Sequence, residues 1–318
     1  MGGVDIPSTT GTASLDEPTV VMRGGRRTVY MSWIDGADRF IGRAGPGPGM
    51  HPLSFSYASI AMRPQFAWEQ GAVQSPDATL DGNDVVMVYA AGGAIGFARS
   101  TDGTTFTARS EPILTAERDP MRGNEGAALT QPSIARAPTG EWLMAYASDA
   151  RIFLARAPRP EGPWERMDAE PGGVRDPIVS PASSTVADAG GAFEMVSVGD
   201  PVLVVLQTAI GRTSYRVFYT ATGPAPATTI GAAASFDVTC PGATAMRPCF
   251  SRVPQPVFAV SGTSLRAGSF DRVSDRIGLL WVGSGSAPSR TAPMPARRIN
   301  AGVSPADLDL LPWVPRDQ

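Results

Sequence analysis

The stretch DEPTVVMRGGRRTVYMSWIDGADRFIGRA, residues 16–44, predicts the fold because its pattern returns along the chain. It opens with carboxylates and a proline, continues as a short β-branched strand, and turns at Gly24 and Gly25. A second strand, which alternates apolar and polar residues, ends in the aromatic Trp33, and a third strand follows at residues 40–44. Alternation of this kind is typical of strands, and paired glycines favour hairpin turns.

The same unit recurs about every 58 residues. Further copies begin at Ser75, Gln131, Phe193 and, in weaker form, Gln255. The leading prolines Pro18, Pro76 and Pro132 are 58 and 56 residues apart, and Glu194 and Gln255 continue the period at about 62 and 61. Sheets of four strands repeated around an axis are the blades of a propeller. The sequence therefore predicts an all-β, five-bladed β-propeller. A β-sandwich is the main alternative, but it would not produce this recurring unit.

Composition sets the class of protein. The chain has 318 residues, 42% hydrophobic and 18% charged, which is typical of a globular protein. We expect a Gly/Ser/Thr-rich linker over residues 1–13 and one propeller domain over 14–318. The net charge of −3 without a basic stripe argues against nucleic acid as a partner. No apolar run is long enough to predict a transmembrane segment. A monomer is expected.

Two cysteines bear on the compartment. Cys240 and Cys249 flank a short loop, and a disulfide there would indicate a secreted, periplasmic or lipoprotein-anchored protein; two free thiols are the alternative. The chain holds one histidine and no phosphate-binding or dinucleotide-binding motif, so no cofactor and no metal site are predicted. Whether a structural calcium ion binds stays open at this point.

The residues that open the inner strands predict where a site would lie. In a propeller these strands line a central funnel, so Asp16, Pro76, Gln131, Glu194 and Gln255 should each open one of them. Three of the repeats carry a carboxylate at or beside this position: Asp16 and Glu17, Asp77, and Glu194. A pair of carboxylic groups in one cavity is what cleavage of a glycosidic bond requires.

The repeat also resembles a known group of enzymes. Residues 95–103, IGFARSTDG, and residues 161–164, EGPW, are similar to segments of the five-bladed propeller glycoside hydrolases. That group includes arabinanases and β-xylosidases, invertases and levansucrases, and β-mannoside phosphorylases. The resemblance covers roughly residues 14–285. It implies a glycoside hydrolase-like protein that acts on carbohydrate.

The resemblance implies roles for particular residues. Glu17, with Asp16 beside it, matches the base or nucleophile that precedes the proline of the first blade. Glu194 matches the general acid that opens a later blade, although no proline follows it. Asp77 matches a second-blade acidic residue that would modulate the site or contact the substrate. Gln131 stands where the group has its middle carboxylate.

Further residues are expected to contact the substrate. They are Asp16, Ser75, Gln131 and Gln255 at the inner strands, and Trp68 as a stacking surface for sugar. Because glutamine can bind sugar but cannot titrate, a non-catalytic propeller that binds glycan or protein is the alternative function.

Overall fold

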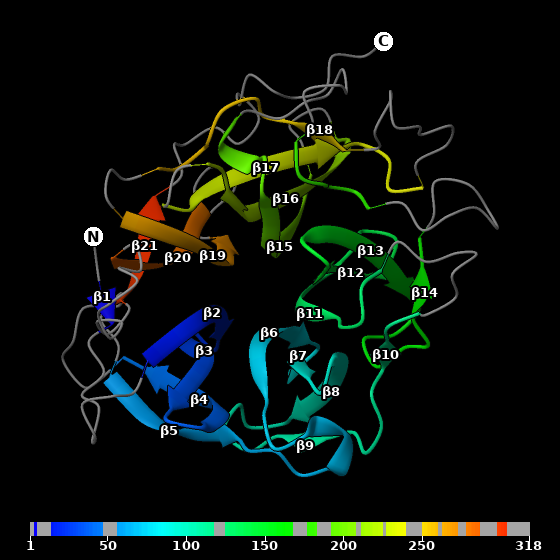
Figure 1. Cartoon of the computed structure of the whole chain (residues 1–318). Coiled ribbons are helices and arrows are strands. Elements are labelled where there is room, and N and C mark those ends of the chain that lie inside the picture. Colours follow the sequence, from blue (N-terminus) through cyan, green and yellow to red (C-terminus); the bar gives the residue numbers. More distant parts are fainter. Residues whose placement is uncertain are drawn as a thin grey trace.

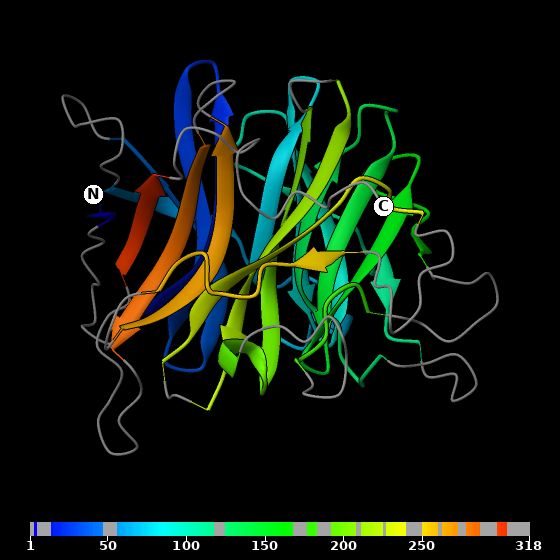
Figure 2. The same cartoon turned by 90° about the horizontal axis from the view of Figure 1, so that it is seen from above.

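The computed structural model describes residues 3–4, 14–46, 56–117, 125–167, 177–182, 192–207, 211–224, 227–239, 250–259, 263–272, 278–286 and 298–303. These residues form antiparallel β-sheets arranged around a common centre (Figure 1), and the strands run between the two faces of the molecule (Figure 2). The β-propeller that the sequence predicts is confirmed.

The sheets follow one another along the chain. The first sheet contains β2 (Ser14–Arg23), β3 (Arg26–Asp35), β4 (Asp38–Gly45) and β5 (Ser56–Met62). The second contains β6 (Gln74–Asp81), β7 (Asp84–Ala91), β8 (Ala94–Ser100), β9 (Thr107–Ala108) and β10 (Leu114–Thr115). The third contains β11 (Thr130–Arg136), β12 (Trp142–Ser148), β13 (Arg151–Ala157) and β14 (Glu165–Arg166).

The fourth sheet contains β15 (Ser197–Gln207), β16 (Thr213–Thr222), β17 (Thr229–Ser235) and β18 (Ser251–Arg252). The fifth contains β19 (Thr263–Arg272), β20 (Gly278–Ser286) and β21 (Arg298–Val303), and its outer edge is β1 (Gly3–Val4). The pairing of β1 with β21 joins the two ends of the chain in one sheet. Two short 3₁₀ turns, η1 (Ala67–Glu69) and η2 (Ala192–Glu194), precede β6 and β15.

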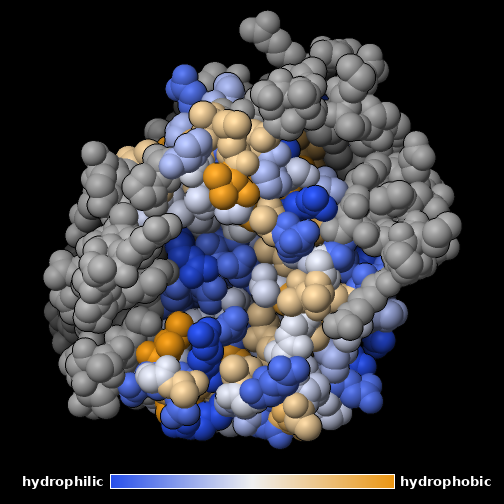
Figure 3. All heavy atoms as spheres, in the orientation of Figure 1, coloured by the Kyte–Doolittle hydropathy of each residue, from blue (hydrophilic) through white to orange (hydrophobic). Residues whose placement is uncertain are grey.

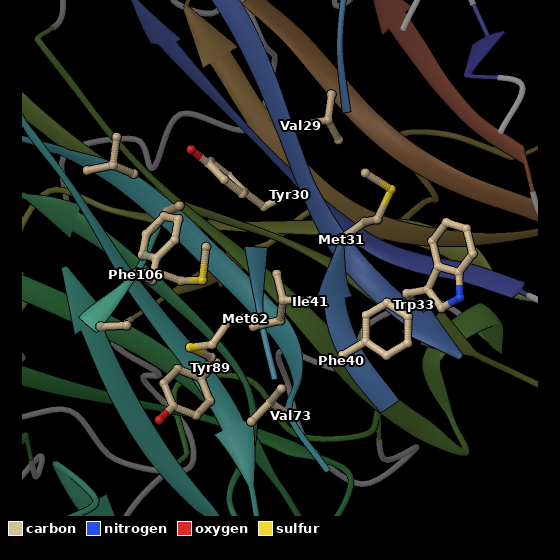
Figure 4. Close-up of a cluster of buried hydrophobic side chains, with 14 of the residues drawn as sticks. Val29, Tyr30, Met31, Trp33, Phe40, Ile41, Met62, Val73, Tyr89 and Phe106 are labelled. Atoms are coloured by element: carbon tan, nitrogen blue, oxygen red, sulfur yellow. The ribbon is translucent and has the colours of Figure 1, made fainter. Parts of the chain in front are cut away.

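The core lies between neighbouring sheets. Val85, Met87 and Tyr89 of β7 pack with β3 of the first sheet (Figure 4), whereas Val86 and Val88 pack with β12 of the third. Other clusters join the third sheet to the fourth and the fourth to the fifth. Strand β7 is therefore buried on both faces, which explains why its residues 85–91 are all apolar. Burial of each large side chain contributes roughly 1.5–3 kcal/mol.

Hydrogen bonds tie each inner strand to the next sheet. The acceptors Thr19 Oγ1, Asp77 Oδ2, Ser133 Oγ and Ser269 Oγ receive the backbone N–H groups of Ala78, Ile134, Leu203 and Val20, at 3.2, 2.7, 3.0 and 3.2 Å. Thr220 Oγ1 receives the N–H of Ala267 at 2.9 Å and links the fourth sheet to the fifth. The contacts close a circle through all five sheets, which fixes the inner strands relative to one another.

Two further observations concern the whole chain. No helix in the described ranges has the length and apolar character needed to cross a membrane. Cys240 and Cys249 lie outside the described residues, so their disulfide stays a prediction.

Candidate functional site

Four inner strands share one unusual local structure. Glu17, Ser75, Gln131 and Asp200 have positive φ angles of 52°, 52°, 52° and 45°. Each precedes a proline, and each lies where the pairing register of its strand shifts. A β-bulge re-aims a side chain, and residues other than glycine occupy left-handed backbone only at a cost of about 1 kcal/mol or more. Because strained backbone tends to occur at functional sites, the same strain in four sheets indicates that this position belongs to a functional site.

The fifth sheet reaches the same position differently. Its bulge lies between Ala267 and Ser269 and has no proline. The residue between them is Gly268, and a Cβ there would lie 2.7 Å from Cγ of Pro18. Only glycine lets β19 approach the first sheet this closely. Arg266, two residues earlier, supplies the side chain that reaches the centre.

Glu17 is held by donors from three sheets. Its Oε2 accepts hydrogen bonds from Ser32 Oγ at 2.7 Å and from Ser75 Oγ at 2.8 Å. Its Oε1 accepts from Nη2 of Arg266 at 3.0 Å. The side chain is only 15% exposed. These contacts therefore hold the carboxyl group of Glu17 in a defined orientation.

Arg266 joins three carboxylates. It contacts Asp200 through Nη2 at 2.6 Å and Nε at 2.9 Å, and it contacts Asp16 through Nη1 at 2.5 Å. Glu17 is the third partner. Burial alone would lower the pKa of Arg266, but the negative charges of Asp200, Glu17 and Asp16 outweigh burial and raise the pKa above its usual value. The guanidinium stays charged, and the carboxylates around it outnumber it.

One residue from each sheet enters a continuous chain of contacts. Ser75 binds Glu17, Glu17 binds Arg266, Arg266 binds Asp200, and Gln131 Oε1 accepts the N–H of Asp200 at 3.0 Å. Hydrophilic residues gather in a hollow near the centre of the face shown in Figure 3. Side chains that lie far apart in the sequence thus meet where the inner strands converge.

The carboxylates of Glu17 on the first sheet and Asp200 on the fourth sheet lie close together. Oε1 of Glu17 and Oδ1 of Asp200 contact the same nitrogen of Arg266, at 3.0 and 2.6 Å. These oxygens are therefore at most about 5.6 Å apart. Paired carboxylates of glycoside hydrolases lie roughly 5–5.5 Å apart in retaining enzymes and 6.5–9.5 Å apart in inverting ones. This upper bound on the nearest oxygens allows the separation found in retaining enzymes.

The structure brings together several residues that the sequence singled out. Asp16, Glu17, Ser75 and Gln131 all belong to the chain of contacts. The sequence reasoning missed Asp200 and Arg266. Asp200 could have been found, because Asp200-Pro201 repeats the residue–proline–strand pattern of the other sheets.

Two predicted strand openings are wrong. Glu194 lies in η2, before β15 begins at Ser197, and Gln255 is an exposed residue between β18 and β19. The spacing misled us because Pro132 and Pro201 are 69 residues apart, not about 58. The longer connection between the third and fourth sheets shifted the expected opening from Asp200 back to Glu194.

Glu194 belongs to a different repeated feature. It is fully buried, accepts a hydrogen bond from Tyr219 Oη at 2.5 Å, and pairs with Arg252 at 3.5 Å. Tyr89 donates to Glu69 at 2.7 Å and Tyr146 donates to Glu125 at 2.5 Å in the same manner. Each of these glutamates precedes its sheet's left-handed residue by six positions. The structure thus gives Glu194 a hydrogen bond and an ion pair with residues of the fourth sheet.

Trp68 also has packing contacts. Its ring stacks on Tyr89, with ring centroids 6.1 Å apart and planes 25° apart, and it packs against the core between the first two sheets. Its expected role as a sugar platform stays a prediction.

Asp77 is separate from the chain of contacts and instead binds groups on the first and third sheets. Thr19 Oγ1 donates to its Oδ1 at 2.8 Å and the N–H of Ile134 donates to its Oδ2 at 2.7 Å. Burial raises the pKa of Asp77 to about 6, although these hydrogen bonds act in the opposite direction. Asp77 therefore connects three sheets through a carboxyl group that titrates well above its ordinary range.

The raised pKa predicts how stability depends on pH. Because the folded protein binds the proton of Asp77 more tightly than the unfolded chain does, the free energy of unfolding should fall as pH rises from about 4 to 6. The contribution is at most about 3 kcal/mol. Asp77→Asn should remove this slope, while Asp38→Asn, at the exposed first residue of β4, should keep it. Urea unfolding across this pH range measures the effect, and equal slopes in all three proteins would contradict it.

Among the described residues, no group of three or more histidine, cysteine, aspartate or glutamate side chains could hold a metal ion. The guanidinium of Arg266 occupies the place between the acidic groups instead.

Comparison with known proteins shows the fold. No protein-family profile matches the chain, and no curated protein matches it in sequence. One solved structure was reported for the GH130 family of mannoside phosphorylases, which contains glycoside hydrolases that target β-1,2 mannosidic linkages in Candida mannan. It matches with a TM-score of 0.65 and 14% identity, over 92% of this chain and 84% of that chain.

Two further structures match over nearly their whole length. An exo-1,5-α-L-arabinanase from a bovine ruminal metagenomic library has a TM-score of 0.61 and 11% identity, over 95% of this chain and 97% of that chain. An α-L-arabinofuranosidase from Podospora anserina has a TM-score of 0.61 and 12% identity, over 96% and 97%. The resemblance to propeller glycoside hydrolases is confirmed at the level of the fold.

Proposed function

We propose that the chain is a five-bladed propeller, one blade for each sheet, that cleaves a glycosidic bond with Glu17 and Asp200 as its two carboxylates. The chain of contacts through Arg266 carries this proposal, because it places two carboxylates from the first and fourth sheets on one nitrogen. Structural neighbours that are glycoside hydrolases support the same class of substrate.

The environments of the two carboxylates suggest different roles. Glu17 accepts hydrogen bonds from Ser32, Ser75 and Arg266, as suits a carboxylate that acts as base or nucleophile. Asp200 is the other carboxyl group that contacts this nitrogen of Arg266. We assign to Asp200 the role of the acid.

The reaction follows from these roles. The hydroxyl groups of the glycan replace Arg266 at one carboxylate, and Asp200 protonates the glycosidic oxygen as its bond to the anomeric carbon breaks. Glu17 removes a proton from water while the water oxygen bonds to the anomeric carbon, or it attacks that carbon first and water then releases the sugar. The anomer of the first product, read by NMR, distinguishes the two routes.

A substrate screen tests the proposal. Wild type should release sugar from at least one member of a panel of aryl arabinofuranosides, xylosides and mannosides together with arabinan, xylan, fructan and mannan. Glu17→Gln should lower that rate about 10²- to 10⁴-fold. Glu165→Gln is the matched control, because the Glu165 side chain is 69% exposed on the outer strand β14. If Glu17→Gln is as active as Glu165→Gln, the assignment is contradicted.

Binding without cleavage is the second candidate function. Arg266 neutralises part of the acidic site, and Gln131 cannot titrate. A wild type that binds one of these glycans, measured by calorimetry, and cleaves none of them would favour this reading. The extracytoplasmic location and the monomeric state stay predictions.

A further inference from the structure

A cleft of about 720 Å³ lies between the second and third sheets, outside the chain of contacts at the centre. It is lined by residues of β8 and β9 and of the connections that follow β8 and β13. In the third sheet, Gln131 lies where β11 and β13 begin, whereas the cleft lies beyond Ala157, where β13 ends. Since β13 has seven residues, the cleft and the candidate site are roughly 20 Å apart along the strands. The cleft is therefore a separate feature, and its volume is within the range of small-molecule sites.

Ion pairs and a hydrogen bond hold the polar groups of the cleft in place. Arg99 contacts Asp81 at 2.9 Å and Asp84 at 3.0 Å on the preceding hairpin. Arg109 donates from Nη1 to the backbone oxygen of Glu161 at 2.8 Å, which joins the second sheet to the connection that follows β13. The polar groups are therefore positioned before a ligand arrives, which lowers the entropic cost of binding one.

The side chain of Glu161 has acceptor capacity left for a ligand. It is 33% exposed, and its carboxylate accepts no hydrogen bond from any residue that the structure describes, although Arg99 and Arg159 lie 3.6 and 3.9 Å from its oxygens. Arg109 keeps further N–H donors beside it, because a guanidinium has five. The hydroxyl group of Thr107 belongs to the same lining. A ligand that fits the cleft must therefore donate to a carboxylate and accept from a guanidinium.

Neighbouring hydroxyl groups meet both requirements, because each hydroxyl donates one hydrogen bond and can accept others. A carboxylate or sulfate group has no proton to donate to Glu161, and an ammonium group has no lone pair to accept from Arg109. A second cleft of about 620 Å³, which Trp164 lines, shares the exposed Pro163 with the first. Pro163 thus offers apolar surface between the two clefts, and a ligand long enough to cross it would occupy both.

We propose that the cleft is a second carbohydrate-binding site, which holds a neutral oligosaccharide away from the candidate active site. The hydroxyl groups of the sugar accept from Arg109 and donate to Glu161, while one ring packs its C–H face on Pro163. This inference does not depend on the proposed function, because binding at the cleft needs no catalytic pair.

Hydrogen exchange in the presence of oligosaccharides tests the inference. The probes are neutral hexasaccharides of mannan, arabinan, xylan and fructan, and all proteins carry Glu17→Gln so that the proposed catalytic pair does not consume them. At least one probe should slow exchange over residues 101–109 and 159–163, which line the cleft. Hexagalacturonate and the chitosan hexamer should need an about tenfold higher concentration for the same protection, because their charged groups lose hydrogen bonds there.

Two variants remove single hydrogen-bonding groups from the cleft. Glu161→Ala should weaken the binding of the best probe about ten- to a hundredfold, because a hydrogen bond to a charged group is lost. Its ion pairs are partly exposed and weak, so the variant should fold. Thr107→Val keeps the shape of its side chain and every ion pair, and it should weaken binding about two- to tenfold. Glu111→Ala, at an exposed position outside the lining, is the matched control and should bind like the parent protein.

Three results would overturn the second site. The first is that no neutral hexasaccharide protects the residues of the cleft. The second is that the protection is the same in Glu161→Ala and Thr107→Val as in Glu111→Ala. The third is that hexagalacturonate or the chitosan hexamer binds there more tightly than every neutral probe, which would make the cleft a site for charged ligands instead.

Discussion

Asp200→Asn should lower kcat about 10²- to 10⁴-fold on any glycoside that the wild type cleaves. The amide keeps the shape of the side chain and can still accept a hydrogen bond from Arg266, but it has no proton to give to the leaving oxygen. Glycan binding should stay within about tenfold, because the hydrogen-bonding geometry changes little. Steady-state kinetics and calorimetry on the same preparation measure both effects.

Glu194→Gln is the matched comparison for this variant. The resemblance to propeller glycoside hydrolases implies the acid role for Glu194, whereas the structure buries it against Tyr219 and Arg252. We expect the folded variant to keep its kcat within about tenfold while its stability falls, since a buried ion pair is broken. Loss of turnover in Glu194→Gln together with normal turnover in Asp200→Asn would reverse the assignment.

Arg166→Met should reduce the free energy of unfolding by about 3–5 kcal/mol, because it leaves Glu125 as a buried charge without its cation. The Glu125 side chain is 0% exposed and contacts Nε of Arg166 at 2.7 Å. Burial alone would raise the pKa of Glu125, but the hydrogen bonds from Arg166 and Tyr146 outweigh it and lower the pKa. The ion pair therefore stabilises the folded state at pH values above the range in which the carboxyl group of Glu125 titrates.

Arg156→Met in the same sheet is the control. Arg156 is 41% exposed and pairs with Glu165, which is 69% exposed. Exposed ion pairs contribute about 0–1 kcal/mol, so this variant should unfold almost like wild type in urea. A cost for Arg166→Met no greater than that for Arg156→Met would show that the buried glutamates do not stabilise their sheets as argued.

The strands could be predicted from the sequence because the residues within each repeat favour strands and turns locally. The β-branched and apolar residues 85–89 predict a strand, and the structure explains why apolar side chains occupy both of its faces: neighbouring sheets cover both faces of β7. The position of Pro18, Pro76 and Pro132 on three inner strands also follows from the repeat.

The position of Asp200 could not be predicted from a fixed period. The longer connection before Asp200 breaks the spacing, although the dipeptide Asp200-Pro201 preserves the local pattern. Matching the pattern of residue, proline and strand would have located Asp200 where counting residues did not.

The contribution of the fifth sheet leaves almost no sequence signal. Arg266 is one arginine among many, and its bulge lacks both the proline and the left-handed residue of the other sheets. Only the closure of the circle, which brings Gly268 against Pro18, shows that Arg266 meets Glu17 and Asp200. The contacts of Arg266 join residues that are far apart in the sequence, so no local sequence pattern predicts them.

A crystal structure of Asp200→Asn with a bound oligosaccharide tests whether Glu17 and Asp200 form the catalytic pair. We predict a sugar ring at the convergence of the five inner strands, with its anomeric carbon beside Glu17 and its glycosidic oxygen within hydrogen-bonding distance of residue 200. A glycan bound elsewhere, with Glu17, Arg266 and residue 200 contacting only one another, would contradict it.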